Sequence, residues 1–300
     1  MAKFVDSAHA PGAAESSRWR ARYLLALRRL ASTPRGAFGL VALAVVLFAA
    51  VFGQALAPQS ATIQNFNEIL APPSSAHVFG TDDLGRDLFT RTIYGARVSL
   101  LVGLCSVGLA VVAGVPIGIA AGYYRGTFDE VSMRVLDGLL AFPALILAIA
   151  IAAALGAGPR NVVIAIGIVT VPTFARLARG QALSLREQDM IVAARAVGLR
   201  DGRILSRYVL PNVASVLIIQ GALSTGQAIL TEAGLSFLGL GIRPPIPSWG
   251  SMIEVGRGYL EQAPWMSVVP GVAILLTVFA FNFTGDALLD ALDPRLQKRG

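Results

Sequence analysis

Long apolar runs, separated by short polar segments, extend over most of this chain. A helix needs about 20 predominantly apolar residues to cross the hydrocarbon core of a bilayer. Six runs approach or reach that length, and we predict six membrane-spanning helices from them, at Phe38–Ala57, Val98–Tyr123, Leu139–Gly156, Asn161–Ala175, Val213–Thr231 and Trp265–Thr284. The expected fold class is an all-α integral membrane protein with six transmembrane helices.

The fifth run is the most polar of the six, because Gln220, Ser224, Thr225 and Gln227 interrupt it. An amphipathic pattern in a membrane helix also fits a buried helix with one side toward a pore. Glu232 follows at the end of this run, and carboxyl groups embedded in membranes tend to be functional. It is a candidate pathway residue, and a helix cap or a position facing the outer water are the alternatives.

Prolines lie in four of the predicted spans, at Pro116, Pro143, Pro172 and Pro270. Each lacks a backbone donor and is expected to interrupt and kink its helix. Kinks are incidental in a rigid bundle, whereas around a pathway they let helices separate and close. The sequence leaves both interpretations open, and the four prolines are candidates for gating.

Composition and charge agree with a membrane protein. Hydrophobic residues make up 55% of the chain and charged residues 14%, whereas soluble domains average about 25% charged residues. The net charge of +7 does not indicate nucleic-acid binding, because the basic residues flank apolar runs and aromatics are not interleaved with them. With six spans, nineteen Lys and Arg residues fall on one side and six on the other. The positive-inside rule then places both termini in the cytoplasm and leaves the loops Pro58–Arg97 and Ala233–Pro264 outside.

The polar segment between the fourth and fifth spans is predicted to be cytoplasmic and ordered. Residues Leu183–Val197 show helical spacing, and Gly198 follows where a left-handed C-cap is expected. A second helix fits Asp201–Tyr208, with Asp201 as N-cap, and Pro211 opens the next span. An amphipathic helix lying on lipid is the simpler alternative. It explains neither the break at Gly198 nor the attachment to a span at each end.

Candidate catalytic and metal sites are missing from the sequence. It contains neither an HExxH motif nor the GxxxxGK[ST] loop that cradles nucleotide phosphates, so we predict that the chain is not an enzyme and does not hydrolyse ATP itself. Asp82, Asp83 and Asp87 lack the spacing of a calcium loop, and Arg86 lies among them. A network of Asp–Arg pairs is the favoured interpretation of that cluster, and no metal site is predicted.

Two parts of the polar segment together resemble the EAA signature of ABC-importer permeases: Val192–Gly198 and Tyr208–Pro211. The resemblance implies that this loop docks a short helix into a groove of a separate ATP-binding subunit. Here Val192 replaces the leading glutamate of the signature and Tyr208 replaces the usual isoleucine. Glu187, Asp189 and Arg195 are candidates for the ionic anchor instead. Ala193, Ala194 and Gly198 fit the small-residue contact surface, and Leu210 and Pro211 complete the implied coupling residues.

Further stretches are similar to the dipeptide, oligopeptide and nickel permeases of this class. They are Phe79–Asp87 with Tyr94–Leu100, Glu232–Gly241 with Pro244–Gly250, and Gly285–Leu296. By this pattern the chain resembles the C-type permease, which pairs with a related B-type permease. The implied fold is that of a type I ABC importer permease. The implied domains are an N-terminal cytoplasmic tail (1–35), a first transmembrane helix (36–58), an external segment (59–95), a five-helix core (96–290) with the coupling loop 177–211, and a C-terminal cytoplasmic tail (291–300).

The resemblance implies one half of the translocation path of an ATP-driven, binding-protein-dependent importer in the bacterial inner membrane. The substrates it implies are di- or oligopeptides, with glutathione-like peptides or nickel chelates as alternatives. Its expected partners are a second homologous permease, two ABC ATPase subunits that hold ATP and Mg²⁺, an extracytoplasmic substrate-binding protein and the lipid bilayer, with no nucleic acid and no cofactor on this chain. The alternative is an ion-coupled secondary transporter that works as a single chain. Such a carrier would show inverted repeats and carboxylates near the midplane, and spans two, three and six lack central carboxylates.

Overall fold

The computed structural model describes residues 33–57 and 60–292 of the 300-residue chain. The predicted tails 1–35 and 291–300, with all their basic residues except Arg35, fall almost entirely outside these described residues. Within them, helices dominate and no β-sheet forms; an isolated antiparallel bridge joins Thr81 and Asp87. The α-helices are α2 (Pro34–Leu56), α3 (Leu88–Tyr124), α4 (Gly126–Leu140), α5 (Ala144–Leu155), α6 (Pro159–Arg186), α7 (Asp189–Ala196), α8 (Asp201–Ile204), α9 (Leu210–Phe237), α10 (Trp249–Gly256) and α11 (Trp265–Leu292).

Each of the six predicted apolar runs coincides with helix. Five helical stretches are long and apolar enough to cross a membrane, and a sixth span is present if α4 and α5 are counted together. These two helices meet at a bend of 89°, so the prediction of one simple span at 139–156 was wrong. Pro143 is the N-cap of α5 and has no N–H to continue the helix from α4. Of the four prolines, it is the one at a helix break; Pro116, Pro172 and Pro270 lie inside uninterrupted helices.

The fourth span is much longer than the 15 residues predicted. Helix α6 continues past Ala175 to Arg186, because two of its arginines find acidic partners on α4. Arg179 forms a two-pronged ion pair with Asp129, and Arg176 pairs with Asp137. A planar guanidinium suits such paired hydrogen bonds to a carboxylate. The charges that suggested the end of a span are therefore contacts between helices.

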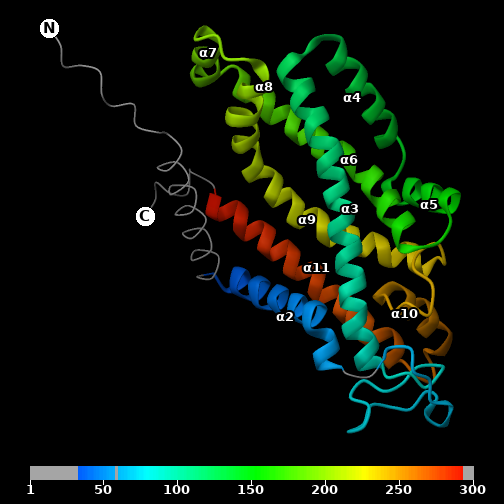
Figure 1. The fold of residues 1–300 in the computed structure, drawn as a ribbon. Coiled ribbons are helices and arrows are strands. Elements are labelled where there is room, and N and C mark those ends of the chain that lie inside the picture. The colour runs from blue at the N-terminus through cyan, green and yellow to red at the C-terminus, as the bar shows by residue number, and fades with distance from the viewer. Residues whose placement is uncertain (1–32, 58–59, 293–300) are drawn as a thin grey trace.

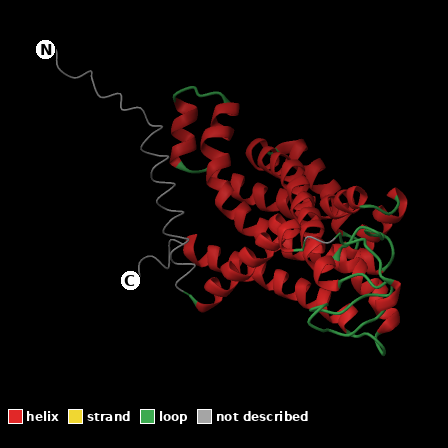
Figure 2. Ribbon diagram, turned by 60° about the horizontal axis from the view of Figure 1, so that its bottom comes forward, coloured by secondary structure: helices red, strands yellow, loops and turns green. Residues whose placement is uncertain are grey.

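The bundle has two distinct ends (Figure 1). One carries α7 and α8 beside the junction of α3 and α4, and we call it the α7 end. The other carries residues 60–87 and α10, and we call it the α10 end. The loops gathered at this second end are also plain in the turned view (Figure 2). Helix α2 packs antiparallel to α11 at the edge of the bundle, where the rings of Phe38 and Phe283 meet edge to face at 5.8 Å.

The closest approach of two long helices is that of α3 and α6. Gly114, Gly118 and Gly122 recur every fourth residue on α3 and face the backbone and Cβ atoms of α6. A Cβ atom at Gly118 would lie 2.1 Å from the carbonyl oxygen of Ala175, so no larger residue fits there without displacing α6. Small residues at this spacing let membrane helices pack backbone to backbone. This glycine repeat was not among the features predicted from the sequence.

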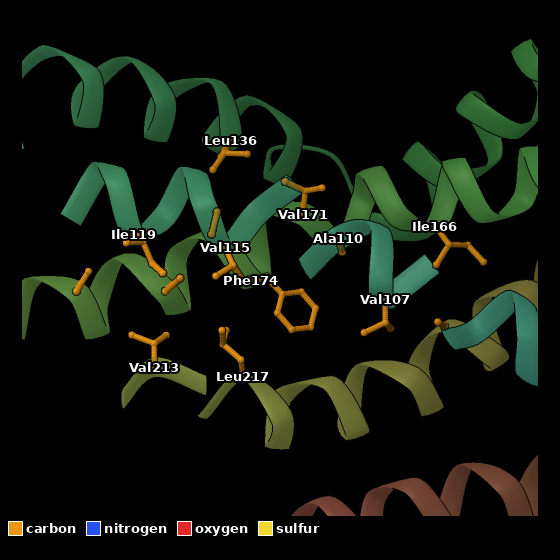
Figure 3. Packing of buried hydrophobic residues seen from close by; sticks show 14 of the residues in the cluster. Val107, Ala110, Val115, Ile119, Leu136, Ile166, Val171, Phe174, Val213 and Leu217 are labelled. Atoms are coloured by element: carbon orange, nitrogen blue, oxygen red, sulfur yellow. The ribbon is translucent and has the colours of Figure 1, made fainter. Parts of the chain in front are cut away.

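The main apolar core fills the space between α3, α6 and α9. Phe174 of α6 is fully buried there. Figure 3 shows its ring between Val115 of α3 and Leu217 of α9. The interlocked side chains fix α9 relative to the tightly joined α3–α6 pair. Helices α6 and α9 are therefore in direct side-chain contact through this core.

At the α10 end, the acidic cluster at Asp82–Asp87 forms the expected network with arginines. Arg86 Nε donates to Asp82 at 2.6 Å, and Arg91 Nε lies 3.3 Å from the same carboxylate. Asp87 instead caps α3 by accepting the N–H of Thr90 at 2.8 Å, and it contacts His77. These contacts hold residues 60–87 over the start of α3.

Candidate functional site: a coupling unit and a polar cavity

The polar segment at the α7 end is divided into more pieces than the sequence indicated. The single helix predicted at Leu183–Val197 was wrong, because α6 ends at Arg186 and α7 begins at Asp189. Gln188 between them is extended. This turn directs α7 back onto the bundle, where Ile191 becomes fully buried. Burial of such an aliphatic side chain stabilises the turned arrangement by about 1.5–3 kcal/mol.

Gly198 ends α7 as predicted, in the left-handed conformation with φ +79°. Its N–H donates to the carbonyl of Arg195 at 2.9 Å, and the N–H of Leu199 donates to Ala194 at 3.1 Å. This pair of bonds is the Schellman arrangement, which satisfies carbonyls that a helix end leaves free. The sharp turn between α7 and α8 is thus set by local backbone chemistry.

The N-cap of α8 lies one residue before the predicted Asp201. Arg200 is the extended N-cap of α8, and Asp201 is the first helical residue. From there the helix continues through a π-helical turn, Leu205–Val209, directly into α9. Pro211 lies in the first turn of α9 and has no N–H for an ordinary i−4 bond. The coupling unit, by which we mean residues 187–211, is therefore joined to α9 without an intervening loop.

Tyr123, at the end of α3, holds the coupling unit in place. Its hydroxyl donates to Asp201 at 2.7 Å, and the guanidinium carbon of Arg195 lies 4.7 Å from the centre of its ring. Arg186 donates to its carbonyl oxygen at 2.7 Å. One residue thus contacts the end of α6, α7 and α8. Tyr123 was not among the residues predicted from the sequence, although an aromatic residue at the polar end of a predicted span is an available signal.

The outer side of α7 is apolar and exposed. Met190, Val192 and Val197 are 41%, 53% and 81% exposed. Ala193 and Gly198 lie exposed among them, as the predicted contact surface requires, whereas Ala194 is buried within this chain and cannot form part of it. Val192, which stands where the signature has a glutamate, adds to this apolar surface.

The candidate ionic anchors of the coupling unit differ in their partners. Glu187 accepts from Arg125 at 2.6 Å, and Arg195 is stacked on Tyr123. Asp189 opens α7, and its carboxylate has no side-chain partner among the described residues. Leu210 is exposed and Pro211 is half-buried at the start of α9. Of the three anchors, Asp189 alone keeps its charge free of contacts within the described part of the chain.

A cavity of about 570 Å³, lined by both apolar and polar residues, lies between α5, α6, α9 and α11. Helix α9 contributes a stripe of Gln220, Ser224, Gln227 and Thr231, and none of the lining residues is charged. Of the four polar residues that the sequence places in this helix, Gln220, Ser224 and Gln227 line the cavity and Thr225 does not. Thr225 is buried away from the cavity, and its hydroxyl donates to the Gly221 carbonyl at 2.7 Å.

The residues predicted for pathway or gating do not line this cavity. Pro116, Pro143, Pro172, Glu232 and Pro270 are all absent from its wall. Glu232 is fully buried, and its carboxylate accepts from Ser236 at 2.8 Å and from Ser99 at 3.3 Å. The hydroxyl of Ser99 in turn lies 3.4 Å from the backbone N–H of Trp249, at the start of α10. Glu232 therefore links α9, α3 and α10 from inside the protein.

The chemistry of both regions is that of contact and packing. Within the described residues no group of three His, Cys, Asp or Glu side chains is placed to hold a metal ion. The coupling unit offers an apolar surface on a fixed support. The cavity offers hydroxyl and amide groups inside a membrane bundle.

Two family models match this chain. Residues 114–298 match the binding-protein-dependent transport system inner membrane component, and residues 23–73 match the N-terminal TM domain of oligopeptide transport permease C. The second match covers α2, and the first begins within α3. The first match also includes the coupling unit and the helices that line the cavity, whereas residues 74–113, with most of α3, lie between the two matches.

Similar proteins extend over nearly the whole chain. It is 44% identical over 272 residues to the dipeptide transport system permease protein DppC of Alkalihalophilus pseudofirmus, covering 91% of this chain and 90% of that one. It is 42% identical over 280 residues to the glutathione transport system permease protein GsiD of Pectobacterium atrosepticum, covering 93% and 92%. Among solved structures, the inward-facing MetNI methionine ABC transporter matches with a TM-score of 0.54 at 18% identity, covering 68% of this chain and 96% of that one. That likeness confirms the predicted fold class.

Proposed function

This chain belongs to the family of binding-protein-dependent transport system inner membrane components, and from that membership we propose how it assembles, couples and selects its substrate. As a permease subunit it is a multi-pass protein of the inner membrane and not an enzyme. We place a second, homologous permease beside it, so that the two chains enclose the path. Two separate ATPase subunits hold ATP and Mg²⁺, and an extracytoplasmic binding protein delivers substrate at the α10 end.

The coupling unit is the surface that contacts an ATPase subunit. The observation that carries this proposal is the exposed apolar side of α7 beside the rigid turn at Gly198. Apolar side chains of this size gain stability when they enter a groove and leave water. Asp189 supplies a free charge at the edge of the contact. Because the unit continues into α9 and is tied to α3 through Tyr123, a push on α7 reaches both helices.

The orientation of the chain in the membrane follows from assigning the coupling unit as the contact with the ATPase subunit. The α7 end is cytoplasmic, and so are both termini, while residues 60–87 and α10 face outward. The distribution of basic residues supports this orientation, since cytoplasmic loops carry an excess of Lys and Arg. ATP binding opens the path outward to the loaded binding protein, and hydrolysis resets it.

The substrate class we propose is short peptides. Its support comes from the relatives, which are named for dipeptide, glutathione and peptide transport. The wall of the cavity combines apolar residues with neutral amide and hydroxyl groups, which is compatible with a peptide, and it has no charged group to select for an ion.

The docking role is tested by placing a charge on α7. Val197→Asp puts a carboxylate at the most exposed apolar position of the coupling unit, and we expect it to abolish co-purification of the ATPase subunits. Ile246→Asp makes the same change at an exposed aliphatic residue of the α10 end and serves as the control. Equal recovery of ATPase with both variants would contradict the docking role. Val197→Leu, which stays apolar, should retain the ATPase and its stimulation by the loaded binding protein.

A further inference from the structure

The cavity between α5, α6, α9 and α11 holds hydrogen-bonding groups that the protein itself does not use. The side-chain amides of Gln227 on α9 and Asn282 on α11, and the hydroxyl of Thr173 on α6, all line it. None of the three has a side-chain hydrogen bond within the described residues. Gln220 donates one N–H to Ser224 at 3.1 Å and keeps its carbonyl oxygen and second N–H free. Thr173 and Gln227 are exposed and Asn282 is half-buried, so these groups are open to water or to a ligand that enters the cavity.

We propose that this cavity is a subsite for the peptide bonds of the transported substrate, bound by the neutral amides of Gln227 and Asn282. The proposal rests on the proposed function of the chain as a peptide permease. A carboxamide side chain carries both donors and an acceptor, so it can accept the N–H and donate to the C=O of a peptide group at the same time. The subsite thus recognises the part that all peptides share.

The absence of charge from the lining residues suits passage as well as recognition. A fixed charge in a weakly screened interior would hold an oppositely charged group strongly and reject a like one. Binding in a transport path must favour entry and still permit release, which neutral hydrogen bonds of modest strength allow. Apolar lining residues such as Leu145, Leu223 and Leu230 lie next to the amides and accept varied side chains. We therefore expect the subsite to accept peptides with varied side chains and to require their backbone peptide groups.

The amide and hydroxyl groups also distinguish this cavity from the apolar groove between α2, α3 and α11. That groove, of about 390 Å³, is lined almost entirely by aliphatic and aromatic side chains. Only the α5–α6–α9–α11 cavity presents free hydrogen-bonding side chains from three helices, so of these two it is the one that suits a peptide.

The test uses the complete complex in proteoliposomes with saturating binding protein. Uptake of a neutral tripeptide is compared with uptake of its depsipeptide analogue, in which an ester oxygen replaces one peptide N–H. The variants are Gln227→Met and Asn282→Leu, which remove the amides while preserving bulk. Thr225→Val is the matched control, since Thr225 lies on the same helix but outside the cavity.

We expect Gln227→Met to lower the initial rate of tripeptide uptake by about two- to tenfold, the range for losing one neutral hydrogen bond. Its uptake of tripeptide and depsipeptide should become nearly equal, whereas the wild type and Thr225→Val should prefer the tripeptide. Normal ATP hydrolysis by the variant would show that assembly is intact. If the wild type takes up the tripeptide and both amide variants keep its rate and its preference, the subsite is overturned and the peptide permease stands. Failure of the wild type to take up any peptide would overturn both.

Discussion

Gly198 shows how one residue shapes the coupling unit. Its φ of +79° lies in the left-handed region, which strains residues that carry a Cβ by about 1–2 kcal/mol. A Cβ there would meet nothing within 4 Å, so the constraint comes from backbone conformation and not from space. Substitution therefore tests the turn without disturbing packing.

We predict that Gly198→Val weakens association with the ATPase subunits while membrane insertion stays normal. The β-branched side chain disfavours the left-handed turn, so α7 loses its fixed direction. Gly202→Val is the control, because Gly202 is also unobstructed but does not have a positive φ. The ratio of ATPase to permease after purification measures the effect, and unchanged ratios in both variants would contradict it.

His77 should make the stability of residues 60–87 depend on pH. Its ring nitrogens lie 2.9 Å from Asp87 and 3.2 Å from Glu68. The hydrogen bond with Asp87, supported by the one with Glu68, raises the pKa of His77 above its ordinary value of 6.5. A raised folded-state pKa means that the protonated form stabilises the fold. This contribution is complete below 6.5 and is lost as pH rises through the raised pKa.

Accordingly, the Tm of the purified wild type should fall between about pH 6 and pH 8 by more than that of His77→Gln, which cannot be protonated. Thermal unfolding in detergent at a series of pH values measures the difference. Parallel curves for the two proteins would show that the contacts of His77 do not depend on its charge.

Among the elements, the α3–α6 pair is the rigid support on which both candidate regions depend. The glycines of α3 bring its backbone against α6, and Phe174 then joins α6 to α9. The polar stripe of the cavity lies on α9, and the end of α3 carries Tyr123 beneath the coupling unit. Motion received at α7 can therefore reach the cavity through packed helices.

Forcing α3 and α6 apart should destabilise the bundle. Gly118→Leu would force side-chain atoms into the space of the Ala175 carbonyl, and overpacking of this kind costs about 1–3 kcal/mol or more. We expect a clear loss of Tm and of monodisperse protein in detergent. Gly108→Leu on the same helix meets nothing within 4 Å and should behave as wild type. A Gly118→Leu protein as stable as this control would refute the close packing.

For the whole molecule, the separation of the α7 and α10 ends makes the orientation testable. Single cysteines replacing exposed Arg200 and exposed Ile246 report on the two ends. The native Cys105 is itself exposed and is first changed to serine. An impermeant thiol reagent added outside intact cells should label position 246 and leave position 200 unlabelled until the membrane is opened. Labelling of both from outside would overturn the orientation.

The amino-acid sequence by itself determined the features that depend on neighbouring residues. The apolar runs could be recognised as candidate spans from their length, because a helix that crosses the bilayer must satisfy its own backbone hydrogen bonds. The left-handed end of α7 at Gly198 follows from one glycine after a helical pattern. The Asp–Arg network at 82–91 likewise joins residues close in sequence.

Tertiary structure decided what depends on residues far apart. The extension of α6 to Arg186 needs acids on α4, and the turn before α7 depends on burying Ile191 against the bundle. The inward position of Glu232 needs Ser99, which is 133 residues away. The cavity needs side chains from four helices, so polar positions on α9 alone could indicate a pore-facing side but not its partners. Spacing along one helix shows which residues share a side, and only packing shows what that side meets.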